Sequence, residues 1–384
     1  MIYLDNAATT CIHPDVLDAM MPYLNGEYGN PGSLYALGRR ANAAVSKARE
    51  QVAKFLNAAP EQVIFTSGGS EANNLVFQGL KDHLKRIGKT HILVSAIEHD
   101  SVLKAANSLI KDGFDVELIQ PMQGIASIDP EAVRQMLRPD TGLISVMYVN
   151  NETGDVSNIP AIAALCHEHA ALFHTDCVQA TGYLALDTQR LGCDFLSISS
   201  HKIHGPKGMG ALYAHDPSLL TPLIVGGSSQ EFGLRGGTEN VAGIVGFGAA
   251  CEFTHKVLSS PYTLRCCCGD YLAEELLRKL RGCHINGSPD AHKQKILNMR
   301  FDGVDAQTLL LMLDSYQICA SAGSACCSME NTPSHVLKAI GLSAEEARSS
   351  VRFSFSRLNF IKELDEAADI IVDCVTQLRG DYYG

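Results

Sequence analysis

Short apolar runs that favour β-strands alternate with helical stretches from about residue 60 to residue 215. This alternation constrains the fold more than any other feature of the chain. The predicted strands cover residues 63–66, 92–95, 116–119, 143–149, 171–175, 195–199 and 210–213. Helices are predicted at about 71–85, 101–112 and 159–169, and another from the Asp129-Pro130 cap onward. Continuous apolar strands separated by helices indicate an α/β fold, with a mainly parallel sheet covered on both faces.

Polar clusters follow five of the predicted strands. They lie at residues 66–71 (TSGGSE), 98–99 (EH), 150–152 (NNE), 176–179 (DCVQ) and 199–202 (SSHK). In a parallel α/β sheet the ligand site lies outside the carboxyl ends of the strands, so the five clusters are expected to meet at one edge. Together they are a much stronger signal than any one of them alone.

The chemistry of these clusters suits a pyridoxal phosphate site. The glycine turn and Ser70 lead into a helix whose free N–H groups favour a phosphate, and the loop has neither a Walker lysine nor a GxGxxG pattern. Lys202, followed closely by glycines, is expected to be a desolvated amine that can form a Schiff base. Asp176 supplies a carboxylate for a pyridinium nitrogen. Taken singly, these features also fit a capped helix, a solvated lysine and, at His99, a capping or core histidine.

Composition excludes several classes of protein. The 384 residues are 46% hydrophobic and 19% charged, which is ordinary for a globular chain of about two or three domains. The net charge of −11 without a basic run disfavours direct nucleic-acid or anionic-membrane binding. No signal peptide is visible, and the longest apolar stretches, such as 241–251, are shorter than the roughly 20 residues that span a bilayer. We therefore expect a cytoplasmic protein.

The cysteines predict neither a disulfide framework nor a metal site. Thirteen is an odd number, and reduced thiols are the default in a chain with no export signal. The run at 266–268 is interpreted as small apolar residues packed around a helix. In the cluster at 166–169, His167 and His169 would diverge on a helix, so we expect no metal there.

The C-terminal part of the chain has a different pattern. A region rich in Gly and Ser at 216–240 precedes predicted helices at 270–280, 306–313 and 361–379 and a strand at 296–301. The strand predicted at residues 2–4 fits either unit, and we assign it to the smaller one. The prediction is a large α/β cofactor-binding domain at 12–255 and a small α+β domain at 256–384 that includes 1–11.

With these motifs in place, the sequence resembles the NifS/IscS-type cysteine desulfurases, fold-type I pyridoxal-phosphate enzymes of aminotransferase class V. The resemblance runs in order over nearly the whole chain, and its most specific parts are the lysine motif and the small-residue loop before Cys326. Besides the five strand-end clusters, the matching motifs are YLDNAATT (3–10), GNP (29–31), GPKG (205–208), RGGT (235–238), SAGSAC (321–326), PSHVL (333–337) and VRFS (351–354).

The resemblance implies a role for each matching residue. Lys202 would hold the cofactor covalently and move protons, Asp176 would pair with the pyridinium nitrogen, and His99 would stack on the ring. Gln179 and Asn151 would contact the ring hydroxyl side. The phosphate would be bound by Gly69, Ser70, Ser199 and His201, and by Thr238 of a second copy, which makes the enzyme an obligate homodimer. Arg352 would bind the substrate carboxylate with Asn30 nearby, and Cys326 would be the catalytic nucleophile that takes the sulfur.

The residues before Cys326 also suggest this role by themselves. Residues 321–325 all have small side chains or none, which suits a mobile loop. Sulfur transfer needs a thiolate that reaches the substrate and then presents its sulfur elsewhere. The chain departs from the family pattern at Cys327, where Thr is common, at Tyr35, where many members have His, and at Cys11, where Pro is frequent. The C-terminus also lacks the longer tail that some members use to dock an iron-sulfur scaffold.

The resulting hypothesis is a cysteine desulfurase that converts L-cysteine to L-alanine and stores sulfur as an enzyme persulfide. The sulfur would pass to an acceptor protein, either an iron-sulfur scaffold or a tRNA thiolation enzyme. Two alternatives stay open: a selenocysteine lyase or other class V transferase, and a non-catalytic thiol or metal scaffold built from the 13 Cys.

Overall fold

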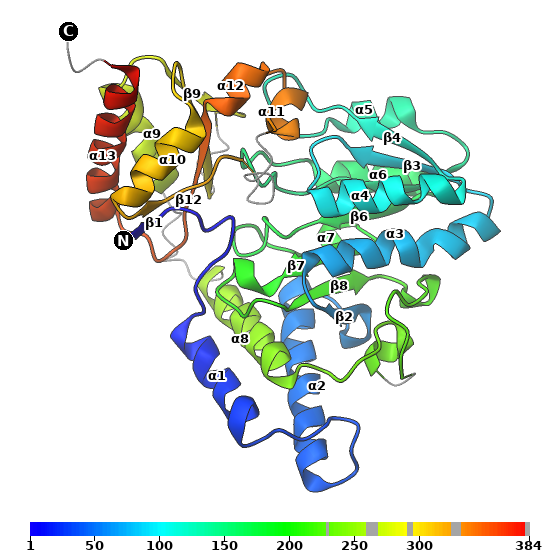
Figure 1. The fold of residues 1–384 in the computed structure, drawn as a ribbon. Helices are drawn as coiled ribbons and strands as arrows, with labels where there is room; N and C mark the ends of the chain where they lie inside the picture. The colour runs from blue at the N-terminus through cyan, green and yellow to red at the C-terminus, as the bar shows by residue number, and fades with distance from the viewer. Residues whose placement is uncertain (228–229, 259–267, 290–294, 324–331, 381–384) are drawn as a thin grey trace.

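The computed structural model describes residues 1–227, 230–258, 268–289, 295–323 and 332–380. Its largest element is a seven-stranded sheet in the order β2-β8-β7-β6-β5-β3-β4 (Figure 1). The strands are β2 (Val63–Thr66), β3 (His91–Ser95), β4 (Asp115–Ile119), β5 (Thr141–Ser145), β6 (Leu172–Asp176), β7 (Phe195–Ser199) and β8 (Gly210–Ala214). Only β8 runs antiparallel to its neighbours, so the predicted mainly parallel sheet is confirmed.

Helices cover both faces of this sheet, as its largely buried central strands require. They are α1 (Pro14–Asn25), α2 (Ala36–Leu56), α3 (Gly69–Arg86), α4 (Asp100–Ser108), α5 (Pro130–Met136), α6 (Ile159–Glu168), α7 (Thr188–Leu191) and α8 (Val241–Leu258). One apolar core joins α1, α2, α6 and α8 to the sheet, and a second joins α3 and α4 to its other face. The sequence analysis predicted neither α1 nor α2, although α2 is one of the main partners of α8.

Two predicted elements are too long. The strand predicted at 143–149 ends at Ser145, because the chain then leaves the ladder and pairs Val149 with Val156 in an isolated bridge. The helix predicted to reach residue 112 ends at Ser108. A 3-10 turn, η2 (Ile110–Asp112), follows it, and Gly113 at φ +88° reverses the chain.

The remaining elements form a smaller α+β unit with its own apolar core. Its sheet has the order β12-β10-β9, and β1 pairs in parallel with β11 beside it. The elements are β1 (Ile2–Tyr3), β9 (Cys283–Asn286), β10 (Ile296–Phe301), β11 (Ile318–Cys319), β12 (Ser350–Ser354), α9 (Cys268–Lys279), α10 (Ala306–Ser315), α11 (His335–Ala339), α12 (Ala344–Arg348) and α13 (Ile361–Arg379). Ile2 and Leu4 belong to this core. The boundaries at residues 12 and 255 stay a prediction, and the latter falls within α8.

Helix α8 is, within the described part of the chain, the one helix long and apolar enough to cross a membrane. Half of its apolar window is buried, and it packs between α1 and α2 against the sheet (Figure 1). A core helix passes the same test of length and composition, so α8 is weak evidence for a membrane span.

A buried ion pair fixes the glycine-rich segment to the start of the large sheet. The Arg49 guanidinium donates to both carboxylate oxygens of Glu231, at 2.6 and 2.8 Å, and to the Val63 carbonyl oxygen at 2.6 Å. The Phe65 amide donates to the same carboxylate at 2.7 Å. The Glu231 side chain is only 4% exposed, so removing its charge leaves the guanidinium buried and unpaired.

We therefore predict that Glu231→Gln lowers the free energy of unfolding by about 3–5 kcal/mol, the usual cost of breaking a buried pair from one side. Urea unfolding followed by circular dichroism measures this. The matched control is Glu27→Gln, which removes the exposed pair with Arg40 and is expected to cost less than about 1 kcal/mol. Equal losses in the two variants would show that the Arg49 pair has no special role.

Candidate active site

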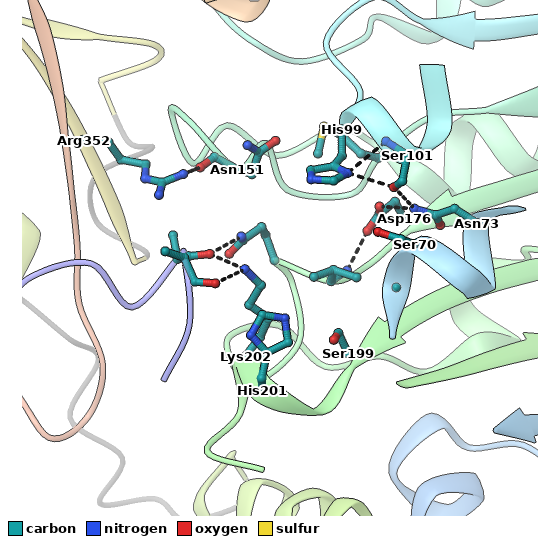
Figure 2. A pocket seen from close by; sticks show the side chains of 16 residues that line it. Ser70, Asn73, His99, Ser101, Asn151, Asp176, Ser199, His201, Lys202 and Arg352 are labelled. Carbon is teal, nitrogen blue, oxygen red and sulfur yellow. Dashed lines mark hydrogen bonds between the residues drawn. The ribbon is translucent and has the colours of Figure 1, made fainter. Parts of the chain in front are cut away.

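A cavity of about 260 Å³ lies at the carboxyl ends of the central strands of the large sheet (Figure 2). The structure brings together there ten residues that the sequence analysis singled out: Gly69, Ser70, His99, Asn151, Asp176, Gln179, Ser199, His201, Lys202 and Arg352. It adds residues that the sequence analysis did not assign to the site: Ala7, Ala8, Asn73, Ser101, Met147 and Val178. The prediction that the strand-end clusters converge is confirmed.

Two predicted site residues that the structure describes are not part of this lining. Thr238 is exposed, and the Asn30 side chain accepts a hydrogen bond from the Gly32 amide at 2.9 Å. Cys326 lies outside the described residues, as does Cys327.

Lys202 sits in the short 3-10 turn η3 (Ser200–Lys202) that follows β7. Its Nζ donates to the carbonyl oxygen of Ala8 at 2.9 Å and to that of Ala7. The Gln179 amide also donates to the Ala7 carbonyl, at 2.9 Å. The N-terminal segment therefore forms one wall of the cavity and orients the lysine.

Asp176 is the last residue of β6, and two donors hold its carboxylate. The Val178 amide donates to Oδ1 at 2.9 Å, and the Asn73 side chain donates to Oδ2 at 2.9 Å. Asn73 also donates to the Ser101 hydroxyl at 2.9 Å (Figure 2). The sequence offered one signal for Asn73, its position one helical turn after the glycine loop.

Glu98 precedes His99 of the cavity lining and is fully buried. Its Oε1 accepts a hydrogen bond from the Met147 amide at 2.5 Å. Burial, and next the nearby Asp176 carboxylate, raise the pKa of Glu98 well above its usual value. Glu98 therefore keeps its proton at neutral pH and adds no negative charge beside Asp176.

His99 is both the N-cap of α4 and part of the cavity wall. Its Nδ1 accepts the Ser101 amide hydrogen at 3.1 Å and lies 2.8 Å from the Ser101 hydroxyl. Because Nδ1 acts as an acceptor, the neutral ring carries its proton on Nε2. The capping interpretation and the site interpretation of this histidine are therefore compatible.

His201 is a neutral ring beside Lys202. Burial, and next the charges of Lys202, Lys207 and Lys295, together lower the pKa of His201 to about 4. Its Nδ1 lies 3.1 Å from the Thr9 hydroxyl. The ring can therefore exchange hydrogen bonds at the cavity without adding a charge at neutral pH.

The glycine loop forms the end of the cavity where α3 begins. A Cβ on Gly69 would lie 2.7 Å from Val178 Cγ2, so only glycine allows this close approach. Beside it, Glu71 pairs with Arg235 at 3.0 Å. Burial raises the pKa of Glu71, but hydrogen bonds from Arg235 and Ser67 outweigh it and lower the pKa overall. The pair ties the glycine-rich segment to the start of α3.

Arg352 reaches the cavity from β12 of the smaller unit and is 2% exposed. Its guanidinium donates to the Asn151 carbonyl at 2.8 Å and to Asp5 at 3.0 Å. The Ser321 hydroxyl donates to the other oxygen of Asp5 at 2.8 Å. Within the described residues, Arg352 Nε is a buried donor that has no hydrogen-bond partner.

Both described ends of the segment that carries Cys326 lie beside Glu152, next to Asn151 of the cavity. The Ser334 hydroxyl donates to Glu152 Oε2 at 2.5 Å. On the other side, Gly323 turns the chain at φ +74°, and a Cβ there would lie 3.1 Å from the same oxygen. Gly323 and Ser334 therefore both lie beside Glu152, the residue that follows Asn151 of the cavity lining.

The donor set fits pyridoxal phosphate. Asn151 Oδ1 and Gln179 Oε1 are buried in the lining and have no hydrogen-bond partner among the described residues, so a bound ring hydroxyl would satisfy them. A lysine, a fixed carboxylate and a glycine-lined helix start provide the other three contacts that this cofactor needs.

The cysteine and histidine cluster of residues 166–169 lies at the end of α6 and in the residue that follows it. His167 faces Asp194, at 3.1 Å, and Cys166 is buried in the core. Elsewhere in the described residues, His91, Asp115 and Glu117 lie close enough to hold an ion. There Arg138 already pairs with both carboxylates, so this cluster is not evidence for a metal.

The fold and the lysine site define a fold-type I pyridoxal-phosphate enzyme, and comparisons with known proteins place it further. The model of the family Aminotransferase class-V matches residues 2–366. A protein named cysteine desulfurase IscS from Dictyoglomus turgidum is 38% identical over 378 residues, which is 98% of this chain and 95% of that relative. The chain therefore belongs to the aminotransferase class-V family, whose cysteine desulfurases depend on pyridoxal phosphate.

Solved structures are also similar to this chain over most of its length. One described as a NifS-like protein superposes with a TM-score of 0.89 at 31% identity, over 98% of this chain and 99% of that chain. Another, described as SspA in complex with cysteine, superposes with a TM-score of 0.81 at 37% identity, over 92% of this chain and 99% of that chain.

Strand β6, which ends at Asp176, also contains a buried histidine, His174, whose effect on stability can be tested. His174 lies between the Ser145 and Ser197 hydroxyls, at 2.8 and 3.1 Å, and burial lowers its pKa to about 3. In the unfolded chain its pKa is about 6.5. Between these values the unfolded state binds one more proton, so stability falls as the pH falls from 6.5 towards 3.

We predict that His174→Gln removes about 2 kcal/mol of the stability that the wild type loses between pH 7 and pH 5. Urea unfolding at both pH values measures the difference. His255→Gln, on the exposed side of α8, is the control and should keep the wild-type loss. An unchanged loss in His174→Gln would contradict the burial argument.

Proposed function

We propose that this protein is a pyridoxal-phosphate-dependent cysteine desulfurase that converts L-cysteine to L-alanine and transfers the sulfur to Cys326. The observation that carries the proposal is a cavity lined by Lys202, Asp176 and the glycine loop, with Gly323 and Ser334, on either side of Cys326 in the sequence, both beside Glu152, the residue after Asn151 of the lining. A lysine cofactor site alone would suit any transferase of the family, whereas a cysteine placed between residues so close to the site favours sulfur transfer.

Nine residues of the cavity would bind the cofactor. Lys202 would hold it covalently, Asp176 would pair with its ring nitrogen, and His99 would stack on its ring. Asn151 and Gln179 would contact the hydroxyl side through oxygens that have no hydrogen-bond partner among the described residues. Gly69, Ser70, Ser199 and His201, at and near the start of α3, would bind the phosphate. When bound, pyridoxal phosphate supplies an electron sink for the pair left at the substrate Cα.

The chain's own groups orient the substrate and move its protons. Arg352 binds the carboxylate of L-cysteine with its remaining donors, and Asn30 assists. The Lys202 amine would act as the base that takes the substrate Cα proton. The carbonyls of Ala7 and Ala8 accept hydrogen bonds from Nζ and fix the direction from which the amine approaches.

Cys326 takes the sulfur as a thiolate. It attacks the substrate sulfur, an S–S bond forms, and the Cβ–S bond breaks with its electron pair left on the carbon side, where a proton completes alanine. The product on the enzyme is a persulfide, which an acceptor thiol on a partner protein then removes. That partner is an iron-sulfur scaffold or a tRNA thiolation enzyme.

Replacement of the lysine tests the assignment. Lys202→Ala is expected to fold, lose the visible absorption band of the bound cofactor, and release alanine from L-cysteine at least about 10³-fold more slowly. The control is Lys111→Ala, which replaces an exposed lysine in the turn η2 and should release alanine at the wild-type rate. Alanine release at the wild-type rate by Lys202→Ala would exclude the proposed chemistry.

Serine replacements of Cys326 and of Cys327 test which of the two thiols is the nucleophile. Cys326→Ser should bind cofactor and L-cysteine normally but release no sulfur, since a serine hydroxyl is a far weaker nucleophile near neutral pH than a thiolate. Cys327→Ser is the matched control and should keep substantial activity. Mass spectrometry after L-cysteine treatment should find the added sulfur on Cys326. An inactive Cys327→Ser with an active Cys326→Ser would reverse the assignment.

The exposed position of Thr238 supports a homodimer with shared sites, because this side chain is free to complete the phosphate site of a second copy. Lys202→Ala protomers and inactive Thr238→Ala protomers should together regain roughly a quarter of wild-type activity after random exchange, since half of the dimers then contain one intact site. No recovery despite exchange, or a monomer in sedimentation, would contradict this arrangement.

A further inference from the structure

Hydrogen bonds link Asp176 to His99 through two other side chains of the cavity lining, Asn73 and Ser101 (Figure 2). The Asn73 amide nitrogen, Nδ2, lies 2.9 Å from Asp176 Oδ2 and 2.9 Å from Ser101 Oγ. The Ser101 hydroxyl in turn lies 2.8 Å from His99 Nδ1. Asp176 ends β6, Asn73 belongs to α3, and His99 and Ser101 lie at the start of α4. These four residues, here called the Asp176 network, therefore join three separate elements of the large unit.

The carboxylate of Asp176 gives this network a direction. A carboxylate only accepts hydrogen bonds, so Asn73 has to present Nδ2 to it. Both hydrogens of Nδ2 are then used, one toward Asp176 and one toward Ser101 Oγ. The Ser101 hydroxyl, which accepts from Asn73, has one hydrogen of its own, and His99 Nδ1 is placed to accept it. The carboxylate therefore determines where the Ser101 hydrogen lies.

The Asn73 amide keeps this orientation although its own oxygen gains nothing from it. Asn73 is 1% exposed, and its Oδ1 has no hydrogen-bond partner among the described residues. Turning the amide over would place Oδ1 against the Asp176 carboxylate, where two acceptors would repel each other. The orientation of the amide therefore depends on the charge at residue 176.

We propose that Asn73 is a positioning residue that couples Asp176 to His99, with the Ser101 hydroxyl as the link between them. This inference rests on the proposed function, in which Asp176 would pair with the ring nitrogen of the cofactor and His99 would stack on the ring. One amide then directs the carboxylate and, through Ser101, supplies a hydrogen bond to the imidazole. A change of charge at residue 176 therefore alters the hydrogen bonding of the His99 ring.

Nuclear magnetic resonance of the histidine rings tests this coupling in the full-length protein after removal of the cofactor. Histidine labelled with carbon-13 at Cε1 gives one signal per ring, and His99→Gln identifies the signal of His99. Asp176→Asn introduces a donor where the carboxylate offered only acceptors, so the Asn73 amide is free to turn over and draw the Ser101 hydrogen away from His99. The His99 signal should therefore move in Asp176→Asn, but not when the same change is made in an Asn73→Leu background.

Asn74→Leu is the matched control. Asn74 is the next residue of α3, and its amide donates to the Ser70 carbonyl at 2.8 Å. In an Asn74→Leu background, Asp176→Asn should move the His99 signal as it does in the otherwise unchanged protein.

Variants of Ser101 interrupt the network at a second point, so the test stands even if Asn73→Leu fails to fold. Ser101→Ala should abolish the response of His99 to Asp176→Asn, whereas Ser101→Thr keeps a hydroxyl and should retain it. A His99 signal that does not move in Asp176→Asn, or that moves equally without the Ser101 hydroxyl or the Asn73 amide, would overturn the proposal.

Cofactor affinity is a second readout, measured by titrating the cofactor-free protein with pyridoxal phosphate. Asn73→Leu should weaken binding by about tenfold, because the Asp176 carboxylate keeps the Val178 amide but loses its other donor. Ser101→Ala leaves both donors to Asp176 in place and should change the affinity by less than about threefold. Equal losses in the two variants would contradict the role of Asn73 in holding the carboxylate.

These experiments distinguish a failure of this inference from a failure of the proposed function. The His99 signals are recorded without cofactor or substrate, so they report on the network whatever reaction the protein catalyses. Alanine release at the wild-type rate by Lys202→Ala would contradict the proposed function and leave the signals of the network unchanged.

Discussion

The arrangement of the site depends on the contacts of the buried Arg352 guanidinium. A charge that is 2% exposed has to be paired, and its partners are Asp5 of the N-terminal segment and the Asn151 carbonyl of the large sheet. These contacts hold β12 of the smaller unit against the cavity. The same N-terminal segment continues to Ala7, whose carbonyl accepts from Lys202 and Gln179. One short stretch of chain therefore aligns the substrate-binding arginine, the lysine and the cofactor wall.

Burial then determines which groups in the site carry charge. Glu98 keeps its proton and His201 stays neutral because each is desolvated beside a group of the charge it would itself carry, Asp176 in one case and Lys202 in the other. Because these two groups carry no charge at neutral pH, the electric field in the cavity comes mainly from Asp176, Lys202 and Arg352. A cofactor that carries a phosphate and a pyridinium nitrogen, and a substrate that carries a carboxylate, match such a distribution.

The sequence predicted the site well where backbone topology decides it. Parallel strands place their carboxyl ends at one edge, so the polar residues that follow β2, β3, β5, β6 and β7 had to meet. It missed residues that act through another side chain: Asn73, which holds Asp176, gives no motif of its own. It also missed Lys295, which stands before an ordinary strand and is buried only by tertiary packing. Thr238 and Asn30, expected in the site, lie outside the cavity that a single chain forms.

The most direct test of the account is the identity of the lysine that holds the cofactor, because the partly buried Lys202 and the buried Lys295 both line a second, smaller cavity. Borohydride reduction of the holoenzyme, followed by digestion and mass spectrometry, locates the pyridoxyl group. The account predicts a single modified residue, Lys202, with Lys295 unmodified. A pyridoxyl group on Lys295, or on any residue other than Lys202, would contradict it.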